Sequence, residues 1–333
     1  MKIFITMPRH PLTETFLTPD VRERLKQAGE VEQNPYDRNL TAEELIRLGV
    51  DAEVLVTGWG TCRLTRQVIE KMHALRLIAH TGGSVALLAD PDIYDVPGLR
   101  VISGNDIYAR SVAEGCLCYT LGALRRIGHY AADMKNGGWM AGGFVNRGLI
   151  GKRVGIVGFG AIARYFLEAI RWFCCEVLIC SSHLSEEEAA AYGGRKAGLD
   201  EIFSTCDVVS LHMSLTQKTE GSIGRDLLMK LKPDALFVNT ARGKLVDEKA
   251  LAELLGQGRF YAALDVYENE PLDADSPLRA CEHALLMPHM AGPTVDMREE
   301  VARELTADIK RLTGGEALRY EITAEQAGRM SRG

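Results

Sequence analysis

Several features that mark particular classes of protein are absent from this sequence of 333 residues. Lys and Arg number 39 against 45 Asp and Glu, so the net charge of -6 leaves no basic excess for holding a phosphate backbone. Nucleic acid is therefore not an expected partner. No apolar run is long enough to cross a bilayer, and the run Met1–Met7 is too short for the core of a signal peptide. We expect a cytoplasmic protein with no membrane partner.

Cysteine and histidine also lack the spacings that mark a metal site. The eight cysteines include no C-x-x-C pair, and most lie in apolar segments, as small core residues of a reducing compartment do. The eight histidines show no pair at metal-binding helical spacing. We therefore expect no bound metal.

What is present is an ordinary globular composition, with 46% hydrophobic and 25% charged residues in a chain long enough for two domains. Apolar runs of strand length alternate with helical segments, which is typical of parallel α/β sheets. The first hundred residues form a small α/β domain without a phosphate-binding fingerprint, and a single long helix is expected at about 111–131. Six strands of a second domain are then expected near 154–157, 177–180, 208–211, 235–239, 262–266 and 285–287.

A glycine-rich turn follows the first of these six strands. Gly158 would allow a tight turn, Gly160 would let the backbone approach a pyrophosphate, and Ala163 would permit close packing of the next helix. That helix would aim its first N–H groups at the phosphates. Taken alone, the turn can also be an ordinary connection between a core strand and a helix, so its meaning depends on the rest of the chain.

Together with later motifs, this turn resembles the D-isomer specific 2-hydroxyacid dehydrogenase family, which includes phosphoglycerate dehydrogenases and hydroxypyruvate and glyoxylate reductases. The resemblance implies an α/β fold of two Rossmann-like domains and a homodimer. A doubly wound parallel-sheet NAD(P)-binding domain at 105–294 would be inserted into a smaller flavodoxin-like substrate domain at 1–104 and 295–333, with no regulatory domain. The motifs that carry the resemblance are Ser111–Glu114, Ser210–Thr216, Asn239–Gly243, Asp265–Pro271 and Pro288–Gly292.

The family's activity is hydride transfer between a nicotinamide cofactor and a small D-2-hydroxy acid or 2-keto acid. The resemblance implies that His289 exchanges the hydroxyl proton and that Glu270 bonds the far nitrogen of its ring. Arg242 would grip the substrate carboxylate in two places, because a guanidinium is a permanent planar cation. These three residues are the expected catalytic residues.

The remaining contacts follow from strand ends and from the resemblance. Asp265 would hold the nicotinamide carboxamide. The loop after the strand at 77–80 carries no second arginine, so we expect a substrate with a small neutral side chain. Expected cofactor contacts are Gly158, Gly160, Ala161, Ile162, Ser181, His212, Thr240, Ala241, Arg242, Asp265, His289 and Gly292, and expected substrate contacts are His80, Gly82, Gly83, Ser84 and Arg242.

Two questions stay open at this point. Ser181 stands where the family has an acid that binds the adenosine ribose of NAD, and no arginine for the NADP phosphate replaces it, so the cofactor is NAD or NADP. The same fold could also serve an enzyme of another small anion, such as a phosphonate, or a dinucleotide-sensing interaction protein that resembles the C-terminal-binding-protein corepressors. A formate-oxidising relative is disfavoured, because formate has no hydroxyl to deprotonate.

Overall fold

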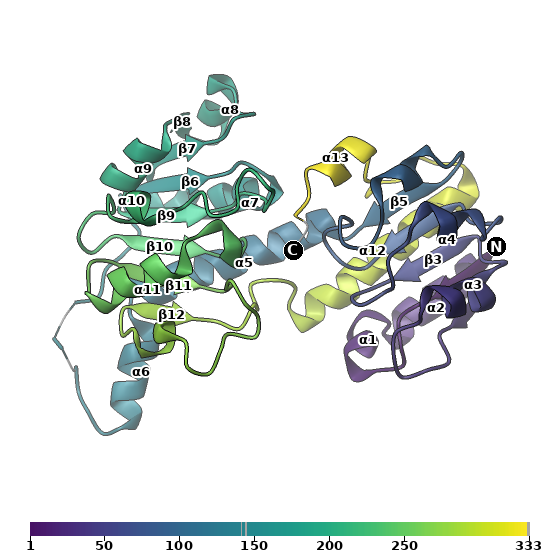
Figure 1. The fold of residues 1–333 in the computed structure, drawn as a ribbon, viewed down its shortest axis with the longest axis horizontal. Coiled ribbons are helices and arrows are strands. Elements are labelled where there is room, and N and C mark those ends of the chain that lie inside the picture. The colour runs from purple at the N-terminus through teal and green to yellow at the C-terminus, as the bar shows by residue number, and fades with distance from the viewer. Residues whose placement is uncertain (141, 144, 332–333) are drawn as a thin grey trace. The chain divides into compact units, whose positions relative to one another are not determined.

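The computed structural model describes residues 1–140, 142–143 and 145–331, and the chain divides into two compact units (Figure 1). The first unit comprises Met1–Ala109 and Pro293–Gly333, and the second comprises Arg110–Gly292. Each unit is built on its own parallel sheet covered by helices, so the fold class expected from the sequence is confirmed.

The first unit has five parallel strands in the order β2-β1-β3-β4-β5, which is the flavodoxin-like order. Helices α1, α2 and α12 share a core with one face of this sheet, and α3 and α4 share a core with the other. The tail after α12 returns to the sheet, where Glu321 bridges Ile102. The strands are β1 (Lys2–Ile5), β2 (Glu30–Gln33), β3 (Val54–Thr57), β4 (Leu77–His80) and β5 (Arg100–Ser103). The helices are α1 (Pro11–Phe16), α2 (Pro19–Ala28), α3 (Ala42–Gly49), α4 (Arg66–Glu70), α12 (Val295–Gly314) and α13 (Ala324–Gly328).

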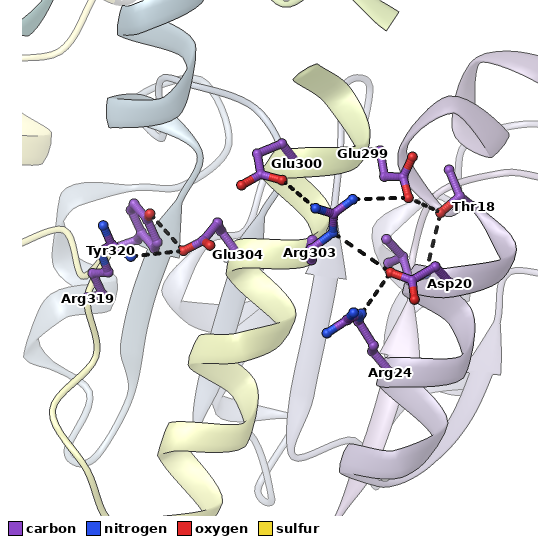
Figure 2. A network of polar contacts seen from close by, with 10 residues as sticks. Thr18, Asp20, Arg24, Glu299, Glu300, Arg303, Glu304, Arg319 and Tyr320 are labelled. Atoms are coloured by element: carbon purple, nitrogen blue, oxygen red, sulfur yellow. Dashed lines mark hydrogen bonds and ion pairs between the residues drawn. The ribbon is translucent and has the colours of Figure 1, made fainter. Parts of the chain in front are cut away.

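A polar network fastens α12 to its neighbours in this unit (Figure 2). Arg303 of α12 pairs with Glu300 at 2.8 Å, with Glu299 at 3.4 Å and with Asp20 of α2 at 3.8 Å. The next residue, Glu304, accepts the hydroxyl of Tyr320 from the C-terminal tail at 2.8 Å. These exposed pairs add little energy singly, so the apolar face of α12 contributes most of the packing.

The second unit has seven parallel strands in the order β12-β11-β10-β9-β6-β7-β8. The strand order reverses at β6, which lies between β9 and β7, and ligands of doubly wound sheets bind beyond the strand ends at such a point. The strands are β6 (Arg153–Val157), β7 (Glu176–Cys180), β8 (Gly194–Lys196), β9 (Val208–Leu211), β10 (Leu236–Asn239), β11 (Tyr261–Leu264) and β12 (Ala284–Leu286). The helices are α5 (Asn105–Leu124), which begins in the first unit, α6 (Ile127–Lys135), α7 (Ala161–Ile170), α8 (Glu186–Ala191), α9 (Leu199–Thr205), α10 (Arg225–Leu228) and α11 (Glu248–Gly256).

Three expectations about these elements were wrong. The single helix expected at 111–131 is two helices, α5 and α6, because Arg126 adopts a left-handed conformation with φ of 52° and interrupts the helix. The second sheet has a seventh strand, β8, which is short and polar and so carries no apolar pattern. Cys118 and Cys174 are exposed, whereas buried cysteines were expected.

Candidate active site

The glycine turn between β6 and α7 lies at the reversal of the second sheet. Gly158 has φ of 96°, and a Cβ there would lie 2.6 Å from the backbone nitrogen of Met213, so a larger residue does not fit. Gly160 is the N-cap of α7 and provides no side-chain cap, and a Cβ there would meet nothing within 4 Å. The first N–H groups of a helix have no partner within the helix. This turn is therefore suited to an anionic ligand.

Polar atoms without partners lie beyond the next two strands. His212 follows β9, and its Nε2 is 2.9 Å from the Ser210 hydroxyl, while its buried Nδ1 has no hydrogen-bond partner. Burial lowers the pKa of His212 to about 4, so the ring is neutral at pH 7. The hydroxyl of Thr240, which follows β10, is also buried without a partner. Buried polar atoms normally have partners, so these two fit a ligand with hydrogen-bonding groups.

Asp265 follows β11 and fixes the turn that carries His289. The side chain is 1% exposed, and its two oxygens accept the backbone N–H groups of Met290 at 2.7 Å and Ala291 at 2.9 Å. Burial raises the pKa of Asp265, and the two N–H groups oppose that rise. His289 itself has φ of 54°, a conformation that a non-glycine residue adopts only when its surroundings hold it there.

Glu270 and His289 form the closest polar pair of the site. The carboxylate Oε2 of Glu270 lies 2.6 Å from Nδ1 of His289, and Oε1 accepts the backbone N–H of Tyr267 at 3.1 Å. The Tyr267 hydroxyl donates to the backbone oxygen of Met287, two residues before the histidine, at 2.9 Å. These bonds join the loop after β11 to the segment that carries His289. With Nδ1 bonded to Glu270, Nε2 is the ring nitrogen of His289 available to a reacting group.

Arg242 reaches the same site from β10. Asn239 shapes its turn, accepting the N–H of Ala241 at 3.0 Å and donating to the carbonyl of Arg242 at 3.0 Å. A Cβ at Gly243 would lie 1.9 Å from the backbone carbon of Tyr267, so this glycine lets the arginine loop pack on the Glu270 loop. Burial lowers the pKa of Arg242 and the charge of Glu270 opposes it, but a guanidinium stays protonated at pH 7.

The sequence analysis assigned no role to four residues that support this arrangement: Asn239, Gly243, Glu248 and Tyr267. Asn239, Gly243 and Tyr267 hold the loops of Arg242 and His289. Glu248 at the start of α11 accepts the backbone N–H of Glu268 at 2.8 Å. Gly243 lies in the motif Asn239–Gly243, which the sequence indicates through Arg242, so a glycine at this position could be noted from the sequence. The contact that requires it could not be noted, because it joins residues distant in the sequence.

The expected substrate contacts lie in the first unit, in the loop after β4. His80 is 5% exposed, and its Nδ1 lies 3.0 Å from the Thr57 hydroxyl. Burial lowers the pKa of His80 to about 4, so it lies beneath the loop as a neutral ring. Its ring requires Gly82, where a Cβ would lie 2.3 Å from Nε2. The Ser84 hydroxyl donates to the backbone of Ser331 at 2.9 Å.

The loop's own backbone remains available for a ligand. The backbone N–H groups of Gly82, Gly83 and Ser84 meet no acceptor in the part of the chain that the structure describes. Free N–H groups of this kind can donate to an anionic ligand.

The other predicted cofactor residues lie near the ends of elements of the second unit. Ala161 and Ile162 begin α7, Ala241 is buried after β10, and Gly292 ends the second unit. Ser181 directly follows β7, where its hydroxyl accepts the N–H of His183 at 3.4 Å. Across the described ranges, no cluster of three His, Cys, Asp or Glu side chains could hold a metal, and no helix has the length and apolarity to cross a membrane.

The fold and this site define a doubly wound nucleotide-binding protein with an acid–base pair beside an arginine. Comparison with known proteins identifies the family within this class. Residues 117–291 match the family described as D-isomer specific 2-hydroxyacid dehydrogenase, NAD binding domain. This match covers more than half of the chain, and the chain belongs to the D-isomer specific 2-hydroxyacid dehydrogenase family.

Similar proteins extend the match beyond this domain. The chain is 33% identical over 318 residues to a D-3-phosphoglycerate dehydrogenase of Methanocaldococcus jannaschii, covering 95% of this chain and 58% of that protein. It is 29% identical to a hydroxypyruvate reductase of Thermotoga maritima, covering 87% and 95%. The solved TT0316 protein of Thermus thermophilus is 26% identical with a TM-score of 0.76, covering 97% and 100%. The chain spans only about half the length of the phosphoglycerate dehydrogenases that it matches.

Proposed function

We propose that this protein transfers a hydride between a nicotinamide cofactor and a small D-2-hydroxy acid or 2-keto acid. The observation that carries the proposal is the 2.6 Å contact between Glu270 and His289, within reach of the charge of Arg242. The family and the names of its relatives agree with this chemistry. We also propose a homodimer, which light scattering of the purified protein tests directly.

The proposed roles follow from the polar atoms. The bound nicotinamide would supply or accept the hydride at C2 of the substrate. In reduction, Nε2–H of His289 donates a proton to the developing alkoxide while Nδ1–H stays bonded to Glu270, and in oxidation Nε2 accepts the proton back. Arg242 binds the substrate carboxylate and polarises the 2-keto oxygen. In the first unit, the N–H groups of Gly83 and Ser84 are the donors that we propose for an anionic group of the substrate.

The proposed cofactor site uses the open features of the second unit. The N–H groups at the start of α7 would face the pyrophosphate across Gly160. The unpartnered atoms of His212 and Thr240 would meet polar groups of the cofactor. Asp265 already accepts two backbone N–H groups, and its oxygens retain lone pairs for the nicotinamide carboxamide.

We propose that the enzyme accepts NADPH as well as NADH, because Ser181 places no carboxylate after β7 to repel the additional phosphate. Ser181→Asp should shift the ratio of kcat/KM values towards NADH by about one to two decades, the scale of a hydrogen bond to a charged acceptor. Ser182→Asp adds the same charge at the exposed neighbouring position and serves as the control. An unchanged ratio in Ser181→Asp would show that this residue does not face the ribose.

A substrate panel tests the activity itself. The purified protein is mixed with NADH or NADPH and with glyoxylate, pyruvate or hydroxypyruvate, and cofactor oxidation is followed by absorbance. Turnover of at least one 2-keto acid is expected. Cofactor binding without turnover would favour a dinucleotide sensor, and turnover of phosphite with NAD in place of keto acids would favour an enzyme of another anion.

A further inference from the structure

The first unit contains an aromatic cluster next to the loop that follows β4. Trp59 lies after β3, and its ring meets the ring of Tyr108 edge to face, with the two centroids 6.3 Å apart. Phe16 packs on Trp59 in the same manner at 5.4 Å. A Cβ on Gly83 would lie 3.6 Å from the Tyr108 ring, so the cluster borders the proposed substrate loop.

One arginine enters this cluster from α12. The guanidinium carbon of Arg298 lies 5.8 Å from the centre of the Trp59 ring. Its Nε is buried and has no hydrogen-bond partner, and no carboxylate of residues 1–140, 142–143 and 145–331 forms an ion pair with it. Among the described residues, the guanidinium of Arg298 is therefore stabilised by a cation–π contact with the indole ring of Trp59.

A second donor in the cluster also has no acceptor. The hydroxyl of Tyr108 is buried without a hydrogen-bond partner. Burial raises the pKa of Tyr108, and the positive charge of Arg298 opposes that rise. Both side chains contact the ring of Trp59. Two buried donors without acceptors around one indole ring are uncommon in a folded protein, and a multidentate anion offers acceptor oxygens to both.

Another arginine of α12 does form ion pairs with nearby carboxylates, in contrast to Arg298. Arg303, five residues later, pairs with Glu299, Glu300 and Asp20 (Figure 2). Five residues correspond to a rotation of about 140° around a helix, so the two arginines lie on different sides of α12. Arg298 lies on the side of the aromatic cluster, away from these acids.

We propose that Arg298, together with Trp59 and Tyr108, determines substrate specificity by binding a second anionic group of the substrate, a distal carboxylate or phosphate. The inference rests on the proposed function, in which the N–H groups of the loop after β4 bind a first anionic group of the substrate. Either anion offers oxygens to both the Nε–H of Arg298 and the hydroxyl of Tyr108. A neutral side chain, which the sequence favours, would leave both donors unpaired.

Steady-state kinetics with matched substrates test this proposal. One pair is 2-oxoglutarate and its neutral amide, 2-oxoglutaramate, and the other is 3-phosphohydroxypyruvate and hydroxypyruvate. The wild-type enzyme should prefer the charged member of at least one pair, and the pair that responds identifies the anion as carboxylate or phosphate. Arg298→Met should lower this charged-to-neutral ratio of kcat/KM by about 10- to 100-fold, the scale of a hydrogen bond to a charged group.

Two further variants make the test specific. Tyr108→Phe removes only the hydroxyl and should lower the same ratio by up to about tenfold. Arg303→Met removes the same charge from the same helix and should leave the ratio as in the wild type. Equal ratios in the wild type and Arg298→Met would overturn the proposal while turnover of hydroxypyruvate persists. Turnover of glyoxylate or pyruvate but of none of these four substrates would also overturn the proposal, whereas turnover of no 2-keto acid at all would contradict the proposed function on which it rests.

Discussion

Replacing Asp265 by Asn tests how the second unit positions His289. The carboxylate accepts two backbone N–H groups, those of Met290 and Ala291, at 2.7 and 2.9 Å. An asparagine has one acceptor oxygen, so its amide nitrogen must face one of these N–H groups. One charge-assisted hydrogen bond is lost, which is worth about 1.5–3 kcal/mol.

The loss of stability should be smaller than this figure. Burial raises the pKa of Asp265, which means that the ionised side chain is itself costly to bury, and the neutral amide removes that cost. We therefore expect the free energy of unfolding to change by no more than about 1–2 kcal/mol. The turn after His289 loses one of its two anchors, however, and kcat should fall by about 10- to 100-fold, equivalent to the lost hydrogen bond.

Single-turnover and steady-state reduction of a 2-keto acid, with unfolding in urea as the stability measurement, separate these effects. Asp207→Asn is a matched control, because Asp207 also accepts a backbone N–H, that of Arg153 at 2.9 Å, but precedes β9 at the other end of the sheet. It should lose stability while keeping kcat. A wild-type kcat in Asp265→Asn would refute the view that this carboxylate positions the histidine.

Three further outcomes are expected. Glu270→Gln should lower kcat, because the Nδ1 of His289 loses the carboxylate that holds it; an unchanged kcat would argue against the pairing. Gly243→Ala should cost about 1–3 kcal/mol of unfolding free energy and reduce kcat, because its Cβ meets rigid backbone, whereas Gly256→Ala, whose Cβ meets nothing within 4 Å, should not; equal stabilities would contradict the close packing. His80 stays neutral in the folded protein down to a pKa of about 4, so between about pH 6.5 and about pH 4 only the unfolded chain takes up its proton and stability falls as the pH drops. His80→Gln should reduce that fall by about 2 kcal/mol at about pH 5 in urea unfolding, and an identical pH dependence would refute the assignment.

The strongest sequence signals were the buried parallel strands. The ranges expected for β4 and β9 agree with the structure, because both strands are fully buried and their sequences, LIAH and VVSL, are mostly apolar. The edge strands β2 and β8 gave no such signal, since their sequences, EVEQ and GRK, are polar. Propensity and pattern therefore located the apolar strands, including the edge strand β12, and missed the polar edge strands β2 and β8.

The candidate site shows the same division between local and distant information. The positions of Arg242, Glu270 and His289 after strands could be anticipated from motifs. The burial of His80 beneath its loop could not, because it depends on the Thr57 hydroxyl of the neighbouring strand. The contact of Arg298 with Trp59 was also missed, since Arg298 comes from α12 and no pattern near Trp59 indicates it.

The central claim is that His289 exchanges the proton of the substrate, and His289→Ala tests it most directly. The wild type and the variant are compared in the reduction of the best 2-keto acid at saturating cofactor, with cofactor affinity measured separately by fluorescence titration. We expect a fall in kcat of about 10²- to 10⁴-fold with little change in cofactor affinity, the usual scale for losing a general acid. A kcat within a few-fold of the wild-type value in a variant that still binds cofactor would contradict it.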